Sequence, residues 1–329
     1  MFNQEIYGVQ LKDKDKKFES QSGGAFTAFA EEILSMQGVV YGVGLDENLQ
    51  ARYCRVTDIG GLSVLKGSKY IQALIDHSFL NVKKDLLDGK KVLFSGTPCC
   101  VDGLLSFLDD CNTNNLITID LICHGVASPL IYNEYLNYIS ENQKKRITKF
   151  NFRDKQMGWH TQYETYFVNG RKKVDNIFAK LFSSRVCLRE SCYNCKYTNF
   201  SRHSDITVGD FWGIEKIKHE IDDNTGISLV LINTEKGKKL FEFSKDQLIC
   251  FSSKKDECKQ PQLCYPSKKS ERYDDFWVDY RSLPFKKIIF NYGKGGVKGV
   301  AKSSIKQLTK TIGIYEFLRC LWKQIKGVR

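Results

Sequence analysis

The sequence predicts an α/β protein (mixed α+β) in which a sheet is layered with helices, with cysteine-rich loops at the sheet edge and a basic helical C-terminal tail. Three observations predict this fold class. Apolar runs of strand length alternate with helical patterns, cysteines follow two of the predicted strands, and basic residues concentrate near the C-terminus. Of the 329 residues, 42% are hydrophobic and 27% charged, which is typical of a globular protein with a well-buried core.

Helices and strands alternate from the N-terminus to about residue 108. A helix is predicted after Ser22-Gly23-Gly24, because apolar residues recur at helical spacing in AFTAFAEEILSM. The other elements predicted in this part are strands at 38–43, 51–56 and 91–94, and helices through Leu74 and Ile75 and over 82–87 and 101–108.

The middle of the chain continues the alternation. A buried strand is predicted at 116–123, where the apolar run LITIDLIC ends at Cys123. The elements that follow are an amphipathic helix at 130–139, a hairpin region at 150–171, a strand ending at Asp210, a buried strand at 227–234 and a helix from 237. We expect one domain over 1–95, a second over 96–284 and a basic tail over 285–329.

No secretory signal or membrane span is predicted. There is no run of about 18 apolar residues, and the N-terminal segment MFNQEIYGVQLKDKDKK has no apolar core. We therefore expect a cytoplasmic protein. In that reducing compartment the twelve cysteines favour metal ligation or redox chemistry over disulfides. Five are interpreted as structural, since free cysteine packs as a small hydrophobe; these are Cys54, Cys100, Cys111, Cys250 and Cys320.

Four cysteines in three segments form a constellation. Cys192-Tyr193-Asn194-Cys195 is a CxxC motif, whose thiolates suit one metal ion, one cluster edge or a dithiol redox centre. Cys99 follows one predicted strand and Cys123 ends the next. Because neighbouring parallel strands end side by side at the edge where sites form, we expect these cysteines to meet. Four thiolates suit an iron–sulfur cluster or zinc, and the redox character of the remaining motifs favours the cluster.

Seven short motifs occur in a fixed order between about residues 18 and 270. They are Ser22-Gly23-Gly24, GSKY at 67–70, GTPC at 96–99, CHGV at 123–126, FRDK with GW at 152–159, LRESCYNCKY at 188–197 and DITVGDFWGIEK at 205–216. On these motifs the chain resembles the coenzyme F-420 hydrogenase/dehydrogenase beta-subunit family, of the type associated with polysaccharide biosynthesis. It lacks the N-terminal ferredoxin segment, CxxCxxCxxxCP, of many members.

The resemblance implies cofactors, ligands and partners. It implies a 4Fe–4S cluster with Cys99, Cys123, Cys192 and Cys195 as ligands, and a flavin, FAD rather than FMN. Residues 1–95 and 96–284 then correspond to the family's N-terminal and C-terminal domains. The partners implied are a small-molecule substrate, expected to be sugar-linked, and an external electron carrier such as a ferredoxin.

Candidate flavin contacts lie in the first two motifs and in GTPC. Ser22, Gly23 and Gly24 offer backbone N–H groups and a helix dipole to a phosphate. The residues alone favour an ordinary helix cap, and the resemblance favours the phosphate site. A cation, a hydroxyl and an aromatic ring occur in Gly67, Ser68, Lys69 and Tyr70, for which a surface turn is the alternative. Thr97 completes these candidates.

Two further motifs carry candidate polar groups. Arg153 and Lys155 are candidates to contact an anionic substrate or a cofactor phosphate, because a guanidinium forms bidentate bonds with such groups. A charged hairpin edge is the alternative. His124, directly after Cys123, is a candidate to donate to a cluster sulfur or to relay a proton, and no other catalytic residue is predicted.

The net charge of +12 is unevenly distributed. From Phe285 onward there are eleven Lys or Arg and one acidic residue, so the tail carries +10 and residues 1–284 carry +2. Apolar residues recur at helical intervals over 302–327, which predicts a basic amphipathic helix, and such a helix would suit the inner face of an anionic membrane. A helix docked on the body is the alternative. A nucleic-acid partner is not expected, because the body lacks a basic face.

Three functions compete. The first is an iron–sulfur flavoprotein oxidoreductase that passes electrons between an external carrier and a small, sugar-linked substrate, with a role in polysaccharide biosynthesis. The second is an electron-transfer subunit of a larger redox complex. The third is a zinc-stabilised binding protein. The four-cysteine constellation and the family resemblance favour the first.

Overall fold

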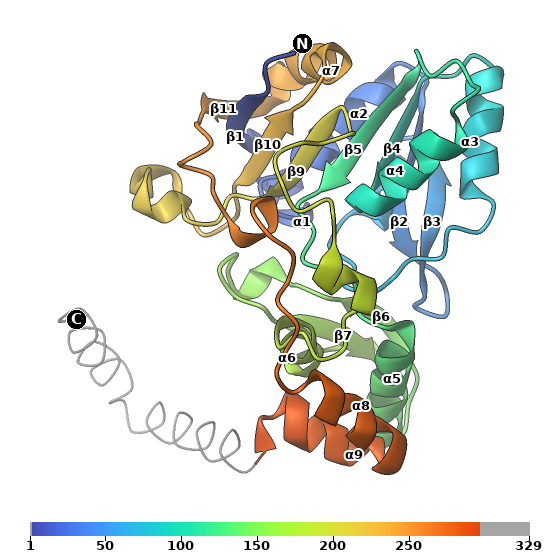
Figure 1. Ribbon diagram of the computed structural model, residues 1–329, viewed down its shortest axis with the longest axis vertical. Helices are drawn as coiled ribbons and strands as arrows, with labels where there is room; N and C mark the ends of the chain where they lie inside the picture. The colour runs from blue at the N-terminus through green and yellow to red at the C-terminus, as the bar shows by residue number, and fades with distance from the viewer. Residues whose placement is uncertain (1, 297–329) are drawn as a thin grey trace.

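The computed structural model describes residues 2–296, which form two lobes (Figure 1). The upper lobe contains an eight-stranded mixed sheet in the order β11-β1-β10-β9-β5-β4-β2-β3, and the lower lobe contains an antiparallel sheet in the order β6-β7-β8. The amphipathic helix predicted over 302–327 lies outside the described residues.

The strands of the large sheet are β1 (Glu5–Leu11), β2 (Val39–Leu45), β3 (Ala51–Val56), β4 (Val92–Gly96), β5 (Leu116–Leu121), β9 (Ile206–Asp210), β10 (Ser228–Ile232) and β11 (Leu248–Ser252). Those of the small sheet are β6 (Ile147–Asn151), β7 (Glu164–Val168) and β8 (Arg171–Asp175). The α-helices are α1 (Lys14–Glu19), α2 (Ala25–Ser35), α3 (Ser78–Leu87), α4 (Pro98–Phe107), α5 (Pro129–Gln143), α6 (Ile177–Ser183), α7 (Glu235–Ser244), α8 (Tyr273–Ser282) and α9 (Phe285–Ile288). No helix within residues 2–296 has both the length and the apolarity to cross a membrane.

Parallel pairing in the centre of the large sheet determines where a site can form. β2, β4, β5 and β9 run parallel, and β10 runs antiparallel to β9. The carboxyl ends of β4, β5 and β9 and the start of β10 therefore meet at one edge, which faces the lower lobe (Figure 1). Loops leaving that edge are the usual place for a site in an open α/β sheet.

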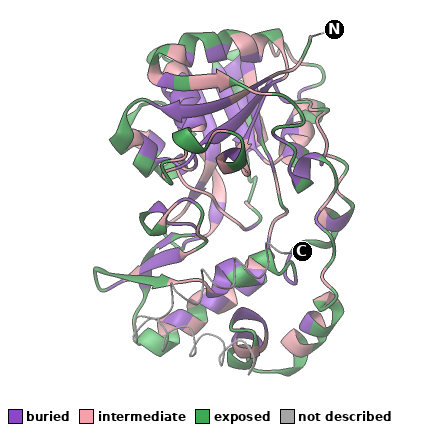
Figure 2. Cartoon of the chain, turned by 90° about the vertical axis from the view of Figure 1, so that its left-hand side faces the viewer, coloured by how far each residue is buried: buried purple, intermediate pink, exposed green. Residues whose placement is uncertain are grey.

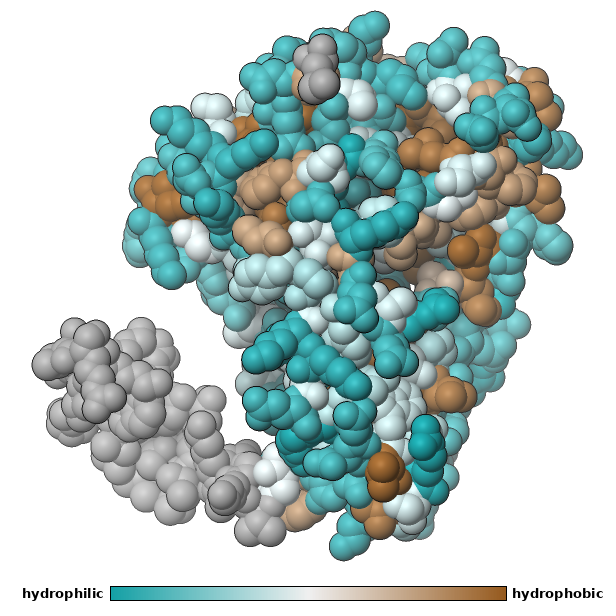
Figure 3. All heavy atoms as spheres, viewed as in Figure 1, coloured by the Kyte–Doolittle hydropathy of each residue, from teal (hydrophilic) through white to brown (hydrophobic). Residues whose placement is uncertain are grey.

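Apolar side chains on both faces of the large sheet explain its layers. One buried cluster joins the sheet to α2 and α7, and another joins β2, β4 and β5 to α3 and α4. A third cluster, in the lower lobe, joins the small sheet to α5, α6, α8 and α9. Figure 2 shows the buried residues running along the strands and the inner faces of the helices. The face in Figure 3 is mostly hydrophilic, with separate hydrophobic patches.

The mixed α/β fold class is confirmed, as are the principal predicted elements. One predicted helix is wrong: the segment through Leu74 and Ile75 is extended. The N–H of Leu74 donates to the carbonyl of Ala51 (2.9 Å), and Leu74 lies beside Arg52. The edge of β3 offers unpaired backbone groups there, and satisfying them outweighs the local helical pattern.

The predicted division of the chain at residue 95 falls within β4. The large sheet contains strands from both sides of this position, so the two segments share one sheet. Their assignment to two family domains stays a prediction. The first residues of the predicted tail belong to the lower lobe, because Ile288 and Ile289 are buried in its core.

A buried carboxylate makes the lower lobe sensitive to pH. Glu164 on β7 is fully buried and accepts hydrogen bonds from the Tyr135 hydroxyl (3.0 Å) and from the backbone N–H groups of Phe178 (2.8 Å) and Ala179 (3.1 Å) in α6. Burial raises its pKa to about 7, against the opposing effect of these hydrogen bonds.

We expect the stability of the protein to fall between about pH 4.5 and pH 7 because of Glu164. In this window the folded state binds a proton that the unfolded state has released, so the contribution is full at low pH and lost as pH rises. The pKa difference corresponds to at most about 3 kcal/mol. Urea unfolding across this range should show the decline, and Glu164→Gln should remove it. The same substitution at exposed Glu141 should leave this pH-dependent fall in stability unchanged.

Candidate functional site

A cavity of about 480 Å³ lies at the sheet edge between the two lobes, within the size range of small-molecule and cofactor sites. Thirteen of the residues predicted from sequence line it: Ser22, Gly24, Gly67, Ser68, Lys69, Tyr70, Thr97, Cys99, Cys123, His124, Arg153, Cys192 and Cys195. Gly23 and Lys155 do not line it. The structure thus brings together residues from six separate motifs, while their roles stay predictions.

All four predicted ligand cysteines face this cavity. Cys99 lies in the first turn of α4, Cys123 lies two residues after β5, and Cys192 and Cys195 belong to a 3-10 turn and its end. Burial raises the pKa of the Cys123 thiol to about 12, and the neighbouring thiols of Cys192, Cys99 and Cys195 act in the same direction. The four sulfurs are therefore close enough to interact electrostatically.

The backbone around Cys123 is shaped to admit the CxxC turn. The N–H of Gly125 donates to the Cys123 sulfur (3.4 Å). Gly125 has φ of +112°, a backbone conformation that other residues rarely adopt. A Cβ at this position would also lie only 3.2 Å from Cβ of Cys192. Glycine therefore allows both the backbone conformation and the close approach of the CxxC turn. An N–H donated to a sulfur stabilises its thiolate form, the form that binds metal.

Four thiolates suit an iron–sulfur cluster or a zinc ion, and the assignment of these four to a cluster stays a prediction. Among residues 2–296, no three His, Cys, Asp or Glu side chains are close enough to hold one metal ion. Zinc needs such compactness, because each Zn–S bond is only about 2.3 Å. A cubane binds each thiolate through a different iron and so accepts wider spacing.

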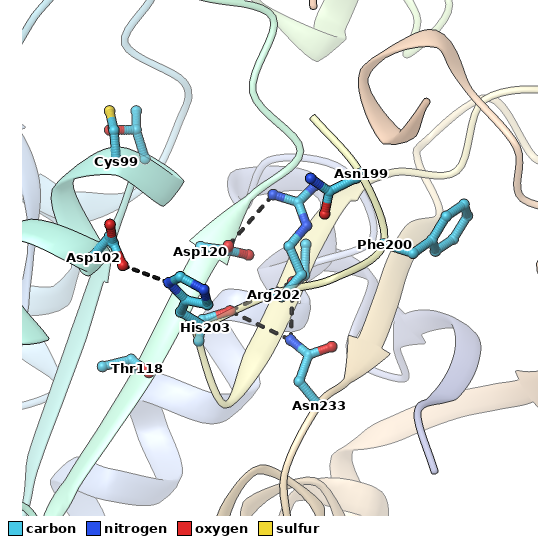
Figure 4. A network of polar contacts seen from close by, with 12 residues as sticks. Cys99, Asp102, Thr118, Asp120, Asn199, Phe200, Arg202, His203 and Asn233 are labelled. Atoms are coloured by element: carbon cyan, nitrogen blue, oxygen red, sulfur yellow. Dashed lines mark hydrogen bonds and ion pairs between the residues drawn. The ribbon is translucent and has the colours of Figure 1, made fainter. Parts of the chain in front are cut away.

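A polar network joins the segments that carry two of these cysteines (Figure 4). Asp102, one turn after Cys99 on α4, accepts hydrogen bonds from Tyr197 and His203, which follow Cys195. These bonds lower the pKa of Asp102. Behind them, the buried guanidinium of Arg202 points toward Asp120 of β5. The network fixes the loop after the CxxC motif against α4 and β5.

The first turn of α2 is open toward the cavity. The Ser22 hydroxyl donates to the carbonyl of Ile227 (2.8 Å) and does not cap the helix. Gly24 is the N-cap, with φ of +86° and no side-chain cap. Gly23 packs against the sheet, since a Cβ there would lie 2.2 Å from the carbonyl oxygen of Val9. The Ser228 hydroxyl accepts from the N–H groups of Gly23 (2.9 Å) and Ala25 (3.5 Å), so the α2 terminus offers its helix dipole and the remaining N–H groups of its first turn to a ligand.

Both predicted lysine contacts are engaged with backbone carbonyls. Lys69 donates to the carbonyls of Leu65 (3.1 Å) and Lys66 (2.8 Å). Lys155 donates to the carbonyl of Ser22 (2.9 Å) from behind the cavity wall. Burial lowers the pKa of each lysine to about 8. Both ammonium groups therefore hold loops of the site in place.

Arg153 is paired with an aspartate that sequence reasoning left without a role. Its guanidinium donates to Asp210 (2.6 Å) and to the carbonyl of Trp159 (2.6 Å), and the Trp159 indole donates to the same Asp210 carboxylate (2.6 Å). The guanidinium also lies 4.9 Å from the ring centroid of Trp212. The joint presence of FRDK-GW and GDFW was the sequence signal for this network.

Two buried donors in the cavity wall have no partner among the described residues: Nε of Arg153 and Nε2 of Gln21. Buried donors in proteins are nearly always hydrogen-bonded. Within the described part of the chain, these two groups stay unpaired beside the cavity, and neither atom is exposed to it. Gln21 was not predicted from sequence.

His124 opens onto the cavity but is enclosed by protein. Its ring is exposed to solvent on the cavity side, yet protein atoms surround most of it, so loss of bulk water lowers its pKa. The opposite charges of Asp210 and Arg153 shift this pKa in opposite directions. The lowered pKa favours the neutral imidazole, which has one donor and one acceptor nitrogen.

Apolar and thiol groups that the sequence did not single out complete the wall. Phe182 of α6, which the sequence did not single out, stacks on the predicted Tyr70 at 4.6 Å between centroids, which gives the cavity a flat aromatic side. Cys100, interpreted from sequence as structural, also lines the cavity and accepts a hydrogen bond from the Tyr53 hydroxyl (3.1 Å). Only the tertiary structure places these groups at the site.

Comparison with known proteins identifies the family. The family model described as coenzyme F420 hydrogenase/dehydrogenase, C terminus of the beta subunit, matches residues 89–257. The chain belongs to this family. The expected resemblance is therefore confirmed, and the chain is related to subunits of redox enzymes.

A solved structure shares the fold. A chain of the xenon-derivatised F420-reducing NiFe hydrogenase complex from Methanosarcina barkeri superposes with a TM-score of 0.51 at 16% identity. The match covers 75% of this chain and 81% of that one. At this identity the likeness concerns the fold alone. No curated protein matches the chain.

Proposed function

We propose that this protein is a cytoplasmic iron–sulfur flavoprotein oxidoreductase that passes electrons between an external carrier, such as a ferredoxin, and a small substrate. The observation that carries the proposal is the convergence of Cys99, Cys123, Cys192 and Cys195 on one cavity. Membership of the hydrogenase/dehydrogenase beta-subunit family supports redox chemistry at that cavity.

The four cysteines would hold a 4Fe–4S cluster on one wall. The other walls offer two features that a flavin needs: a flat aromatic side at Tyr70 and the N-terminus of α2 for a phosphate. When bound, the cluster supplies one-electron transfer and the flavin couples single electrons to two-electron chemistry. We propose FAD rather than FMN.

The chain's own residues supply orientation and a proton. The Asp210 carboxylate holds Arg153 and Trp159 in place in the wall of the site. Lys69 and Lys155 fix the loops beside it. His124, neutral and open to the cavity, holds or accepts the proton that accompanies electron transfer.

The substrate and the location of the protein are the finer parts of the proposal. We propose a sugar-linked substrate in polysaccharide biosynthesis, the setting that the family resemblance implies, and membrane contact through the basic tail. The +10 charge from Phe285 onward supports the membrane contact. Deleting residues 297–329 should then abolish binding to anionic lipid vesicles, and unchanged binding would refute this part.

An electron-transfer subunit without its own substrate is the second candidate. The solved neighbour is a chain of a multi-subunit hydrogenase complex, which favours protein partners for this chain also. Anaerobic mixing with a reduced ferredoxin and a panel of phosphorylated sugars separates the two. Substrate-dependent reoxidation of the protein alone supports the enzyme, and reoxidation only after adding a partner protein supports the subunit.

A further inference from the structure

Four cationic side chains line the cavity: Lys66, Lys69, Arg153 and Arg189. Three of them are engaged within the protein. Lys66 pairs with a glutamate carboxylate at 3.1 Å, Lys69 donates to backbone carbonyls, and Arg153 pairs with an aspartate at 2.6 Å. A charge that is already paired adds little to the recognition of an incoming ion.

Arg189 differs from these three. Its backbone is anchored, because its N–H donates to the carbonyl of Val126 (2.9 Å) in the loop that follows Cys123. Its side chain is exposed, and within residues 2–296 its guanidinium has no hydrogen bond or ion pair. Among the described residues, the cavity therefore presents a single free cation, on a fixed backbone, to any molecule that enters.

The position of Arg189 places this charge beside the redox wall. It precedes Cys192 by three residues, and its charge acts on the Cys192 thiol. None of the other exposed residues that line the cavity is a Lys, Arg, Asp or Glu; they are Gln72, Ile75, Cys99, Leu121, His124, Gln162, Ser183 and Ser191. No carboxylate among the described lining residues competes for Arg189, since Asp210 is held by Arg153.

We propose that Arg189 receives an anionic group, a carboxylate or a phosphate, of the redox partner that enters the cavity. A guanidinium matches both groups through two parallel hydrogen bonds, and its attraction is stronger in a partly enclosed site than in bulk water. Arg189 thereby selects negatively charged partners and brings them next to Cys192. This assignment deepens the proposed function and rests on it.

Paired alkylating reagents test the charge effect without any cofactor. Iodoacetate and iodoacetamide react alike with thiolates but differ by one negative charge, so the ratio of their rates at Cys192 is independent of how much thiolate is present. In cluster-free protein, Arg189→Gln should lower this ratio about threefold at low salt. In Arg189→Lys the ratio of the two rates should stay close to the wild-type value. Arg185 lies outside the cavity lining, so Arg185→Gln should leave the ratio unchanged.

Cys264, exposed and outside the lining, provides an internal control whose ratio should not change. An unchanged ratio at Cys192 in the Gln variant, or an equal fall at Cys264, would overturn the proposal. Because this measurement needs no cluster, it stands or falls separately from the proposed function.

Redox probes of opposite charge test the same residue in loaded protein. Each ferricyanide trianion or hexaammineruthenium(III) trication removes one electron from the reduced protein. Arg189→Gln should slow reoxidation by ferricyanide about threefold and leave the ruthenium rate equal or faster, with the difference vanishing at high salt. Equal slowing by both probes would contradict a role in selecting anions. A colourless protein with nothing to reoxidise would instead count against the proposed cluster.

Discussion

Replacing Cys123 by alanine is expected to lower the bound iron at least about tenfold, because it removes one of the four proposed thiolate ligands. The Cys123 sulfur faces the cavity and receives the N–H of Gly125. Loss of the cluster should also remove its broad visible absorption. Iron and sulfide analysis after anaerobic purification measures both effects.

Cys187 offers a closely matched control. Its thiol, like that of Cys123, has a pKa raised to about 12 by burial, but it does not line the cavity. Cys187→Ala should therefore retain full iron content and lose only packing energy, about 1 kcal/mol. Equal iron loss in both variants would show that folding, rather than ligation, controls iron binding. Full iron in Cys123→Ala would reject Cys123 as a ligand.

Replacing Asp210 by alanine is expected to destabilise the protein by about 3–5 kcal/mol, because it leaves the Arg153 guanidinium buried without a counter-charge. Only 2% of the Arg153 side chain is exposed. The Trp159 indole N–H loses its acceptor in the same step. Urea unfolding of wild-type and variant protein measures the difference in free energy of unfolding.

The double variant Arg153→Met/Asp210→Ala separates the charge effect from a general packing defect. With no buried cation left, it should be clearly more stable than Asp210→Ala alone. If the double variant is no more stable than Asp210→Ala, the unpaired Arg153 charge is not the cause of the destabilisation. Flavin retention should nevertheless fall in both, since both lose the Arg153 guanidinium fixed in the wall of the site.

Local pattern was sufficient for much of the fold. Buried strands such as β5 and amphipathic helices such as α2 are recognisable because their apolar periodicity agrees with the tertiary structure. β1 and β11 were not predicted, although they pair with each other at one side of the sheet. Their short mixed sequences become strands through pairing with distant residues, which local sequence does not reveal.

The site was predictable only in part, for a physical reason. Residues in motifs, such as Cys192 and Cys195, could be assigned to one site because their spacing carries chemical information. Whether a charge is free or paired depends on tertiary neighbours. Lys69 and Arg153 were expected to contact ligands with their charges, yet the structure pairs both with protein groups. Arg189 passed unnoticed in the sequence and is free among the described residues.

The most direct test of the account is the iron, acid-labile sulfide and flavin content of the wild-type protein purified without oxygen. If the proposed function is correct, the protein is brown and contains about four iron and four sulfide per chain, the composition of a 4Fe–4S cluster, and about one flavin. A colourless protein with about one zinc per chain and no sulfide would contradict it and favour the zinc-stabilised binding protein.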